Sequence, residues 1–474
     1  MLTVELETVL GETESVCPEC LARIPALRVG RGSDVYLKKA CPEHGLFQTI
    51  IWRGQPAWAA WARPKAPGHP RQALTPVSRG CPFDCGLCPD HRQQSCCVLL
   101  EVTQRCDLLC PVCFAAAGGR RTADPSLASL TDRLRQLIQT AGPVNLQLSG
   151  GEPCVRTDLP AIAAQARALG FTFIQVNSNG LRLARDPDFA QRLQAAGVAT
   201  VFLQFDGTRD DIYQRLRGRK LLARKLRAIE HCAAAGLGVV LAPTVAPGVN
   251  ADNLGAILRF ALAHQPAVRG VHFQPISYFG RYPLPLNAAP TDAERITLPE
   301  IISALEAQSG GLVRRENFQP AGAENAWCSF NGNFVSLADG RLVPLTRAPA
   351  AGGCCAPTSL AGGAQPAPGG LERARHFVAR NWAAPGQAAG SGRAAAPSLG
   401  EWDVVLQRAR THALCLSGMA FQDAWTLDLE RLRECHIHIA APDGACVPFC
   451  AYNLTDRSGR SLYRQTLAPA AVPA

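Results

Sequence analysis

The stretch CVLLEVTQRCDLLCPVCF, residues 97–114, decides the fold of this chain. Its first seven residues form a mostly apolar run, which is typical of a parallel strand covered on both faces. Cys106, Cys110 and Cys113 follow this run directly. Because ligands bind beyond the carboxyl ends of parallel strands, the stretch predicts a cysteine loop at the ligand-binding edge of a sheet.

Five further strand-like runs follow, and helical segments separate them. The runs cover residues 144–150, 171–178, 199–207, 237–247 and 268–277. Leucines at three- to four-residue spacing predict a helix over 127–141, and Asp186 followed by Pro187 predicts the start of another. Six strands alternating with helices predict an α/β fold with right-handed crossovers. Six units are too few for a closed eightfold barrel, so we expect a partial (β/α)6 barrel.

The segments on either side of the barrel are assigned from their composition. We expect a small Cys3His metal-binding unit at 15–55, a cysteine-rich segment at 78–97, the barrel at 97–308, and a C-terminal cysteine-rich region at 309–346 and 401–464. Residues 347–400 are rich in Ala, Gly and Pro, which predicts a flexible insertion.

The twenty cysteines among 474 residues are consistent with either a secreted disulfide framework or an intracellular metal protein. The first residues lack the basic and apolar segments of a signal peptide. No uncharged apolar run reaches the roughly 18 residues of a membrane span without Pro or Gly. We therefore expect a cytoplasmic protein whose thiolates bind metals.

The formal charge of +10 says little about partners, because only five of the 48 basic residues are Lys and the composition is biased throughout. The local cluster RLRGRKLLARKLR, residues 215–227, is interpreted as a solvated helix face rather than a contact for phosphate or lipid headgroups. We expect no nucleic-acid partner.

Cys106, Cys110 and Cys113 have the spacing C-x3-C-x2-C. Three thiolates this close can bind three corners of a cubane iron–sulfur cluster and leave the fourth iron open to a substrate. Buried hydrophobic thiols, or a zinc loop with a remote fourth ligand, are the alternatives. The turn SGGEP, residues 149–153, is a second signal, because its glycines would let a ligand approach the backbone and Glu152 could accept from an ammonium group.

The cysteine loop after the first strand and the GGEP turn after the second together resemble the radical S-adenosylmethionine (SAM) superfamily. The resemblance implies that the open iron of a 4Fe-4S cluster binds SAM. One electron, from a donor such as flavodoxin or ferredoxin, would then yield methionine and a 5′-deoxyadenosyl radical that abstracts hydrogen from an unactivated carbon. The cofactor-binding residues that it implies are Gly150, Gly151, Glu152, Pro153, Asn177, Ser178, Gln204 and Asp206.

The remaining cysteines form three groups. Cys17, Cys20, Cys41 and His44 have the spacing of a zinc or rubredoxin-like iron site, and four protein ligands make a structural site more plausible than a catalytic one. Cys81, Cys85 and Cys88, with Cys96 preferred over Cys97, could saturate an auxiliary 4Fe-4S cluster. Cys328, Cys435 and Cys450 could hold a second auxiliary cluster, with Cys415 and Cys446 as further candidates.

Cys154 directly follows the GGEP turn, and it is interpreted as a small filler rather than a radical relay. Cys354 and Cys355 are either incidental or redox-active.

The whole run of cysteine motifs, with GVHFQPISYFGR and CVPFCAYNLT, is similar to the tetraether lipid synthase-like radical enzymes and closer still to the TrsS-type radical SAM (seleno)proteins. Three functions stay open. The first is hydrogen abstraction from a lipid-like substrate, with a peripheral membrane contact. The second is modification of a peptide or small molecule with the help of auxiliary clusters, which a narrow polar pocket would favour. The third is a non-catalytic iron–sulfur electron carrier.

Overall fold

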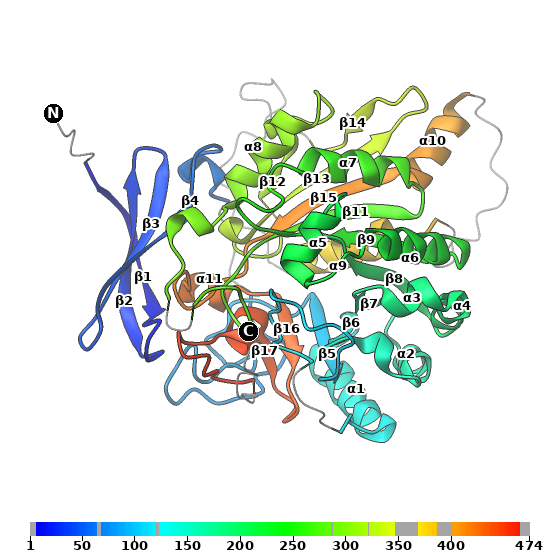
Figure 1. Ribbon diagram of the computed structural model, residues 1–474. Helices are drawn as coiled ribbons and strands as arrows, with labels where there is room; N and C mark the ends of the chain where they lie inside the picture. Colours follow the sequence, from blue (N-terminus) through cyan, green and yellow to red (C-terminus); the bar gives the residue numbers. More distant parts are fainter. Residues whose placement is uncertain are drawn as a thin grey trace.

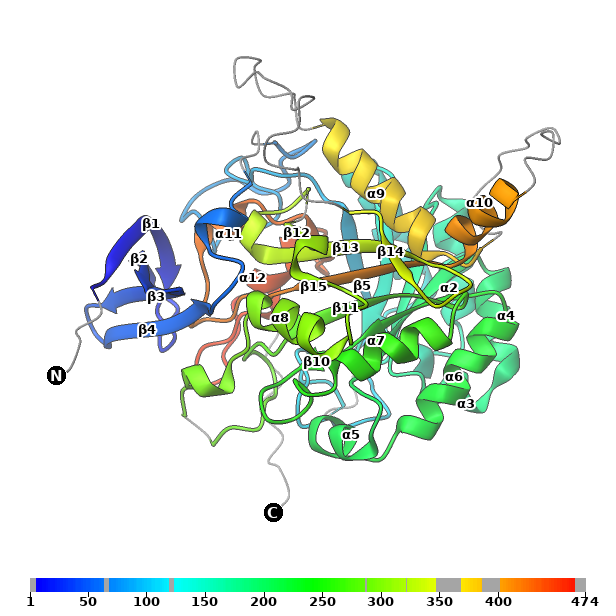
Figure 2. The same ribbon diagram turned by 90° about the horizontal axis from the view of Figure 1, so that it is seen from above.

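Two sheets organise the chain in the computed structural model, which describes residues 6–63, 68–118, 123–285, 288–320, 322–346, 368–385 and 401–464. The smaller sheet is antiparallel and contains β1 (Thr8–Val16), β2 (Arg23–Arg31), β3 (Asp34–Cys41) and β4 (Gly45–Trp52). It lies to one side of the main body in both ribbon views (Figures 1 and 2). The metal-binding unit predicted at 15–55 therefore corresponds to this sheet, which begins at Thr8.

The larger sheet contains the six predicted parallel strands in sequence order. They are β5 (Cys97–Thr103), β6 (Asn145–Gly150), β7 (Ile174–Ser178), β8 (Val198–Gln204), β9 (Gly238–Ala242) and β11 (Val268–Pro275), with the short β10 (Thr244–Val245) beside β11. Every neighbouring pair in this series is parallel. The predicted α/β barrel is thus confirmed, although β7 begins three residues later than the apolar run suggested.

Helices cover the outer face of these strands (Figure 1). They are α1 (Leu127–Ala141), α2 (Leu159–Ala168), α3 (Leu181–Arg185), α4 (Pro187–Ala195), α5 (Asp210–Arg217), α6 (Leu222–Ala234), α7 (Leu254–Ala263) and α8 (Leu298–Gln308). The Asp186 side chain accepts a hydrogen bond from the Phe189 N–H, and Pro187 occupies the first turn, so the predicted cap of α4 is confirmed. Short 3-10 turns occur at Ala59–Trp61, Pro153–Val155, Asp292–Glu294, Arg315–Asn317 and Ala326–Cys328.

The C-terminal region extends the larger sheet at both of its edges. Its elements are β12 (Gln319–Pro320), β13 (Ser329–Ser336), β14 (Leu342–Pro344), α10 (Glu401–Thr411), β15 (Ala413–Met419), α11 (Leu429–Arg433), β16 (Ile437–Ala440), β17 (Cys446–Pro448) and α12 (Phe449–Asn453). Strand β15 pairs in parallel with β11, and β16 pairs in parallel with β5. Both edges of the six-stranded series are therefore extended by one C-terminal segment, which satisfies backbone groups that bare edges would expose.

The prediction of a flexible insertion at 347–400 is wrong for its central part. Helix α9 (Pro368–Trp382) packs against β9, β11 and β15, and Figure 2 shows it beside the β13–β15 end of the sheet. The Thr200 hydroxyl donates to the Trp382 carbonyl at 2.8 Å, and Arg269 Nε donates to the Asn381 carbonyl at 3.1 Å. Because Thr200 and Arg269 lie near the starts of β8 and β11, α9 covers the amino ends of the strands, opposite the cysteine loop. The rest of the predicted insertion lies outside the described residues.

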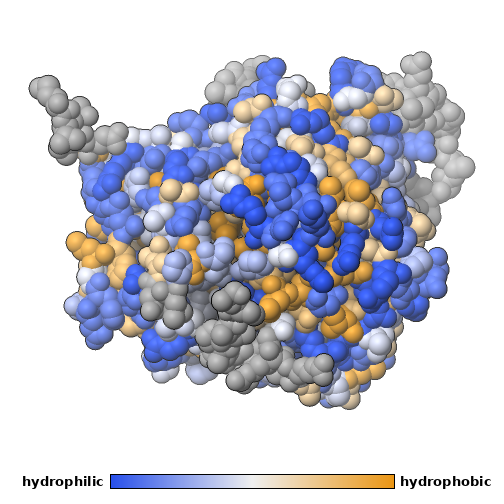
Figure 3. Space-filling model, in the orientation of Figure 1, coloured by the Kyte–Doolittle hydropathy of each residue, from blue (hydrophilic) through white to orange (hydrophobic). Residues whose placement is uncertain are grey.

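Hydrophilic residues are interspersed with smaller hydrophobic areas on the face drawn in Figure 3. Among the described residues, no helix has both the length and the apolar character needed to cross a membrane.

The contact between Gly238 and α9 yields a first test. A Cβ atom at Gly238 would lie 2.1 Å from the Trp382 carbonyl oxygen, so Gly238→Ala must displace the end of α9. We expect hydrogen–deuterium exchange of residues 376–385 to become about tenfold faster in this variant. Gly68→Ala is the matched control, because its added methyl meets only ordinary contacts. Unchanged exchange in Gly238→Ala would contradict the docking of α9.

Candidate active site

The cysteine loop lies at the carboxyl end of β5, and all three of its thiols line a cavity of about 650 Å³ inside the barrel. Arg281, which follows β11 in the chain, holds this loop. Its Nη1 donates to the Cys110 carbonyl at 2.9 Å, and its backbone exchanges hydrogen bonds with Cys113 at 2.8 and 2.9 Å. Burial raises the pKa of Cys106 and of Cys110 above the usual range of thiols. Three thiols that converge on one cavity fit three corners of a cubane cluster.

The GGEP turn is bonded to the residues just before the cysteine loop. The Gly151 N–H donates to the Thr103 carbonyl and the Glu152 N–H to the Arg105 carbonyl, both at 2.8 Å. Gly150 has a φ of 135°, and a Cβ atom there would lie 2.1 Å from the Thr103 oxygen. The sequence predicted that these glycines admit a ligand. The structure shows that they admit the backbone of the loop, which ties the turn to the thiols.

The Glu152 carboxylate is largely committed within the protein. It accepts from the Cys154 N–H at 3.0 Å, the Ser178 hydroxyl at 2.8 Å and the Asn179 N–H at 2.6 Å. Only 2% of the residue is exposed, and burial raises the pKa of this carboxyl. A carboxylate offers about four acceptor positions, so one remains for a group in the cavity, which Glu152 also lines.

The other residues predicted to bind the cofactor divide into two groups. Gly150, Gly151, Asn177, Ser178 and Gln204 line the cavity together with Glu152. Pro153 and Asp206 are buried and lie outside its lining.

Asp206 instead forms a buried ion pair with Arg217 of α5. Arg217 Nη2 lies 2.6 Å from Asp206 Oδ1, and Arg217 Nε lies 2.7 Å from Asp206 Oδ2. The Asp206 side chain is 0% exposed and the Arg217 side chain is 5% exposed. Burial opposes the guanidinium charge, but the Asp206 carboxylate raises the pKa of Arg217 above its usual value. Arg217 Nη1 then donates to the Val112 carbonyl at 2.8 Å, inside the cysteine loop.

Lys225 of α6 is a second buried cation beside the site. Its Nζ donates to the Asn179 carbonyl at 2.6 Å, and burial lowers the pKa of this lysine to about 8. Arg217 and Lys225 both belong to the cluster 215–227, which the sequence analysis interpreted as a solvated face. That interpretation is wrong for these two residues, because each turns inward and holds the backbone of an active-site loop.

Below the cysteine loop the barrel interior is lined by neutral polar side chains, which the sequence analysis missed. Asn145, Gln147 and Gln175 line the cavity there, and Gln274 lines it at the carboxyl end of β11. Gln175 is 3% exposed, and its Nε2 has no hydrogen-bond partner within the described part of the chain. The signal was present in the sequence, since NLQL and IQVN place a polar residue at every second position of an otherwise apolar strand.

Three rings enclose this part of the cavity. The centroids of Phe202 and His272 are 5.6 Å apart, and those of Phe202 and Trp382 are 5.9 Å apart. His272 Nδ1 lies 2.9 Å from the Ser417 hydroxyl, and burial lowers the pKa of His272 to about 4, so its ring is neutral at physiological pH.

The structure brings together three of the four cysteines predicted for the first auxiliary cluster. A hydrogen bond with Cys81 and burial raise the pKa of Cys85, and Cys88 interacts electrostatically with Cys81. Cys96, the predicted fourth ligand, instead lines the main cavity and packs against Ala323.

The predicted C-terminal set also converges. Cys328, Cys435 and Cys450 line a second, smaller cavity of about 30 Å³. Cys415 lines the main cavity, and Cys446 belongs to the hydrophobic core.

Cys154 has a structural environment. Cys154 is fully buried and donates to the Ser178 hydroxyl at 3.3 Å, as expected of a filler. Cys354 and Cys355 lie outside the described residues.

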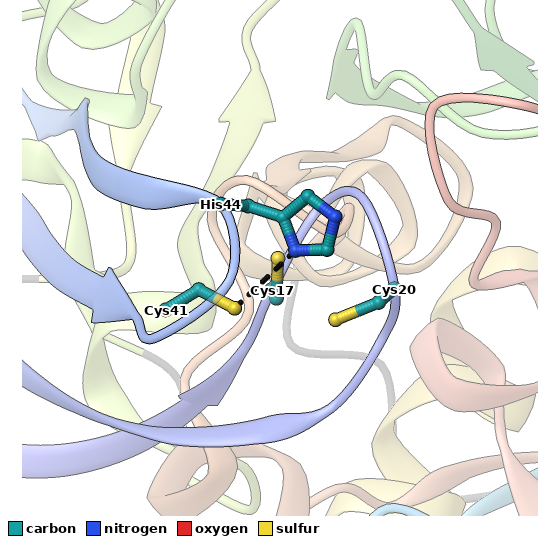
Figure 4. A group of neighbouring side chains, drawn as sticks. All are labelled: Cys17, Cys20, Cys41 and His44. Atoms are coloured by element: carbon teal, nitrogen blue, oxygen red, sulfur yellow. Dashed lines mark hydrogen bonds between the residues drawn. The ribbon is translucent and has the colours of Figure 1, made fainter.

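The N-terminal group brings four candidate metal ligands together in the small sheet. The ligand atoms of Cys17, Cys20, Cys41 and His44 all lie within 4.8 Å of one another (Figure 4). Cys41 Sγ is 3.4 Å from His44 Nδ1, and this contact lowers the pKa of Cys41 to about 7. Four such donors fit a closed tetrahedral zinc site.

The metal site leads to a second test. Cys41→Ser should remove one equivalent of bound zinc or iron per chain, because a closed site loses most of its affinity with one thiolate. Elemental analysis of the purified protein measures this loss, and proteolysis should become faster within residues 8–52. Cys232→Ala, at a buried cysteine of α6, should change neither quantity. Full metal content in Cys41→Ser would exclude Cys41 as a ligand.

The buried pair gives a third test. Asp206→Asn leaves the Arg217 charge buried without a counter-ion, so we expect the free energy of unfolding to fall by about 3 kcal/mol. Arg209→Ala is the control, because Arg209 pairs with Asp252 at the surface, where the two side chains are 43% and 64% exposed. Exposed ion pairs contribute less than about 1 kcal/mol to the free energy of unfolding. Chemical denaturation of the apoprotein measures the free energy of unfolding of both variants. Equal effects would show that the Asp206 pair is no stronger than a surface pair.

Two family models and several known proteins are similar to parts of this chain. The Radical SAM superfamily matches residues 100–261, and the HMPTM N-terminal zinc ribbon domain matches residues 9–53. A PqqA peptide cyclase of Streptomyces rochei is 34% identical over 167 residues, which cover 35% of this chain and 44% of that enzyme. The structure of Streptococcus suis SuiB bound to S-adenosylmethionine aligns with 41% of this chain and 45% of its own at 13% identity, with a TM-score of 0.35.

A 7,8-dihydro-6-hydroxymethylpterin dimethyltransferase of Methanocaldococcus jannaschii is 31% identical to this chain over 492 residues. The aligned region covers 94% of this chain and 94% of the archaeal enzyme. The chain is therefore a radical SAM enzyme that belongs to the family of this archaeal dimethyltransferase.

Proposed function

We propose that this enzyme activates a C–H bond of a reduced pterin or a closely related neutral heterocycle in order to methylate it. The observation that supports this substrate class is the chamber of neutral amide side chains beneath the cysteine loop. The name of the archaeal relative supplies the reaction and the pterin.

The amides suit the hydrogen-bonding edge of a pterin ring. That edge presents N–H donors beside carbonyl and ring-nitrogen acceptors. Each amide side chain offers a carbonyl acceptor for the donors and an N–H donor for the acceptors. Gln175 Nε2 gives the strongest argument for a hydrogen-bonding ligand, because a buried donor without a hydrogen-bond partner costs about 1–3 kcal/mol of stability. A ligand carbonyl or ring nitrogen in front of Gln175 would remove this cost.

The same chamber disfavours a lipid tail. Methylene groups next to Gln147 and Gln175 would bury their amides without hydrogen bonds, at a cost that the gain from apolar burial would have to exceed. Phe202, His272 and Trp382 all line this chamber, and an aromatic ring in its wall offers a face for a flat heterocycle. The buried amides of Gln147 and Gln175 support the small-molecule alternative over the lipid-like one, although apolar side chains form most of the remaining wall.

When bound, the 4Fe-4S cluster on Cys106, Cys110 and Cys113 and its SAM supply a carbon-centred radical, with the electron coming from a donor such as flavodoxin or ferredoxin. The residues of the chain contribute by holding the loops around this group in place. Arg217 and Arg281 hold carbonyls of the cysteine loop, and the Glu152 N–H ties the GGEP turn to this loop through the Arg105 carbonyl.

The test is formation of 5′-deoxyadenosine by anaerobically reconstituted enzyme with dithionite and SAM. We expect 6-hydroxymethyl-7,8-dihydropterin to stimulate it, and deuterium from the labelled substrate carbon to appear in the product. Cys106→Ala should abolish the product, whereas Cys232→Ala, which removes a thiol from the core of α6, should not. Gln175→Leu should raise the KM for the pterin about tenfold, as loss of one buried hydrogen bond predicts.

Stimulation by a long-chain lipid and not by the pterin would overturn the proposed substrate. Undiminished product from Cys106→Ala would overturn the enzymatic reaction itself.

A further inference from the structure

The cysteine loop separates the chamber from the surface of the protein by a single layer of residues. Leu108, Cys110 and Val112 are buried and line the chamber. Asp107 and Leu109 alternate with them in the chain, are exposed, and lie outside the lining of the chamber. A cluster held by this loop therefore lies directly beneath a patch of protein surface.

Exposed cations flank the outer side of this loop. The end of α5 lies against the loop, since the Val112 N–H donates to the Leu216 carbonyl at 3.3 Å. The segment that joins α5 to α6 lies there too, because a Cβ atom at Gly218 would be 3.6 Å from Pro111 Cδ. This segment, the end of α5 and the first half of α6 carry five exposed cations, which we call the basic rim, and these are Arg215, Arg219, Lys220, Arg224 and Arg227.

The positive charge of the basic rim is not neutralised within the described part of the chain. None of its five side chains forms an ion pair there. No acidic residue occurs in the sequence between Asp211 and Glu230. The carboxylates of the loop and of the neighbouring segments already have partners within the chain, and these carboxylates are Asp107, Asp210, Asp211 and Asp252. The rim therefore presents free positive charge beside the loop.

Leu109 adds an apolar centre to this surface. Its side chain is 53% exposed, and it directly precedes Cys110. A single exposed leucine is common on proteins, so Leu109 is informative only through its position. Two peptide units join Leu109 to Pro111, which places their Cα atoms at most about 7 Å apart. An apolar centre with a charged rim is typical of a protein–protein interface.

We propose that Leu109 and the basic rim form the docking surface of a small acidic electron-donor protein, which reduces the cluster on the cysteine loop directly. The donor loses one electron, the cluster gains it, and no covalent bond forms. An acidic partner is favoured because a positive rim attracts it and speeds its association. The N-terminal Cys3His group, in the small sheet to one side of the main body, is then not an obligatory relay (Figures 1 and 2).

The docking surface rests on the radical SAM reaction and not on the pterin. The measured product, 5′-deoxyadenosine, comes from SAM, so a wrong substrate assignment would leave the test of the docking surface intact.

The experiment compares two reductants on the anaerobically reconstituted full chain. Reduced flavodoxin is an acidic protein, whereas dithionite is a small ion that needs no docking surface. The triple variant Arg219→Gln, Lys220→Gln, Arg224→Gln should lower the flavodoxin-driven rate about tenfold at limiting flavodoxin, because steering is lost. Its dithionite-driven rate and its iron content should stay unchanged. Arg215 is kept, because its Nη1 donates to the Gly248 carbonyl.

A matched control removes the same net charge elsewhere on the surface. Arg135, Arg314 and Arg341 lie on other elements, and their side chains are 56%, 71% and 73% exposed. Changing all three to Gln should leave both rates unchanged. Added salt should slow the flavodoxin-driven reaction of the wild type and of this control, and it should have little effect on the triple variant of the rim.

Leu109→Ser tests the apolar centre separately. We expect the flavodoxin concentration that gives the half-maximal rate to rise about fivefold, as truncation of one central interface residue predicts. Iron content and the dithionite-driven rate should stay unchanged, which would show that the loop still holds its cluster.

Equal flavodoxin-driven rates in the wild type and the triple variant would overturn the proposal, and so would an equal loss with both reductants. Loss of only the flavodoxin-driven rate in Cys41→Ser would place electron entry at the N-terminal group and would also overturn it. A ferredoxin is tested in the same way. Failure of both donor proteins, when dithionite yields product, would count against any such docking surface.

Vesicles of phosphatidylglycerol test a membrane as the occupant of the rim. Vesicle binding that the triple variant loses, together with unchanged flavodoxin kinetics, would assign the basic rim to an anionic lipid surface and would overturn the proposal. Absence of vesicle binding, together with the tenfold effect on the flavodoxin-driven rate, would support the electron donor as its partner.

Discussion

The hydrogen-bonded contact between the cysteine loop and its neighbours is the constraint on which the site depends. A loop that must present three thiols to one cavity cannot rely on its own short chain for rigidity. Here Arg217, neutralised by Asp206, holds the Val112 carbonyl, and Arg281 holds the Cys110 carbonyl. The glycines of the next strand let the GGEP turn bond directly to Thr103 and Arg105. Charge compensation and close backbone approach together fix a loop that is otherwise irregular.

Much of this architecture follows from sequence patterns, because local signals agree with tertiary ones. Apolar runs at regular intervals gave the six parallel strands, and Asp186 with Pro187 gave the start of α4. The zinc set was readable because C-x2-C and C-x2-H constrain four ligands within two hairpins. The three thiols of the main loop could be predicted equally well, since they lie close together in the chain.

The features that escaped prediction depend on partners distant in sequence. Nothing local in Ile437–Ala440 indicates that these residues pair with Cys97–Leu99, which lie more than 300 positions earlier. The chemistry of Asp206 was misassigned for a similar reason, because a polar strand end can face either a ligand or a buried arginine. Helix α9 was hidden by an Ala- and Gly-rich composition that is equally typical of linkers.

The position of β15 and β16 also bears on how the protein is made. Both edges of the barrel remain bare until residues 413–440 have left the ribosome, since a single late segment supplies the two outermost parallel strands. During most of translation the nascent sheet thus offers open strand edges, a state that invites wrong pairing between chains.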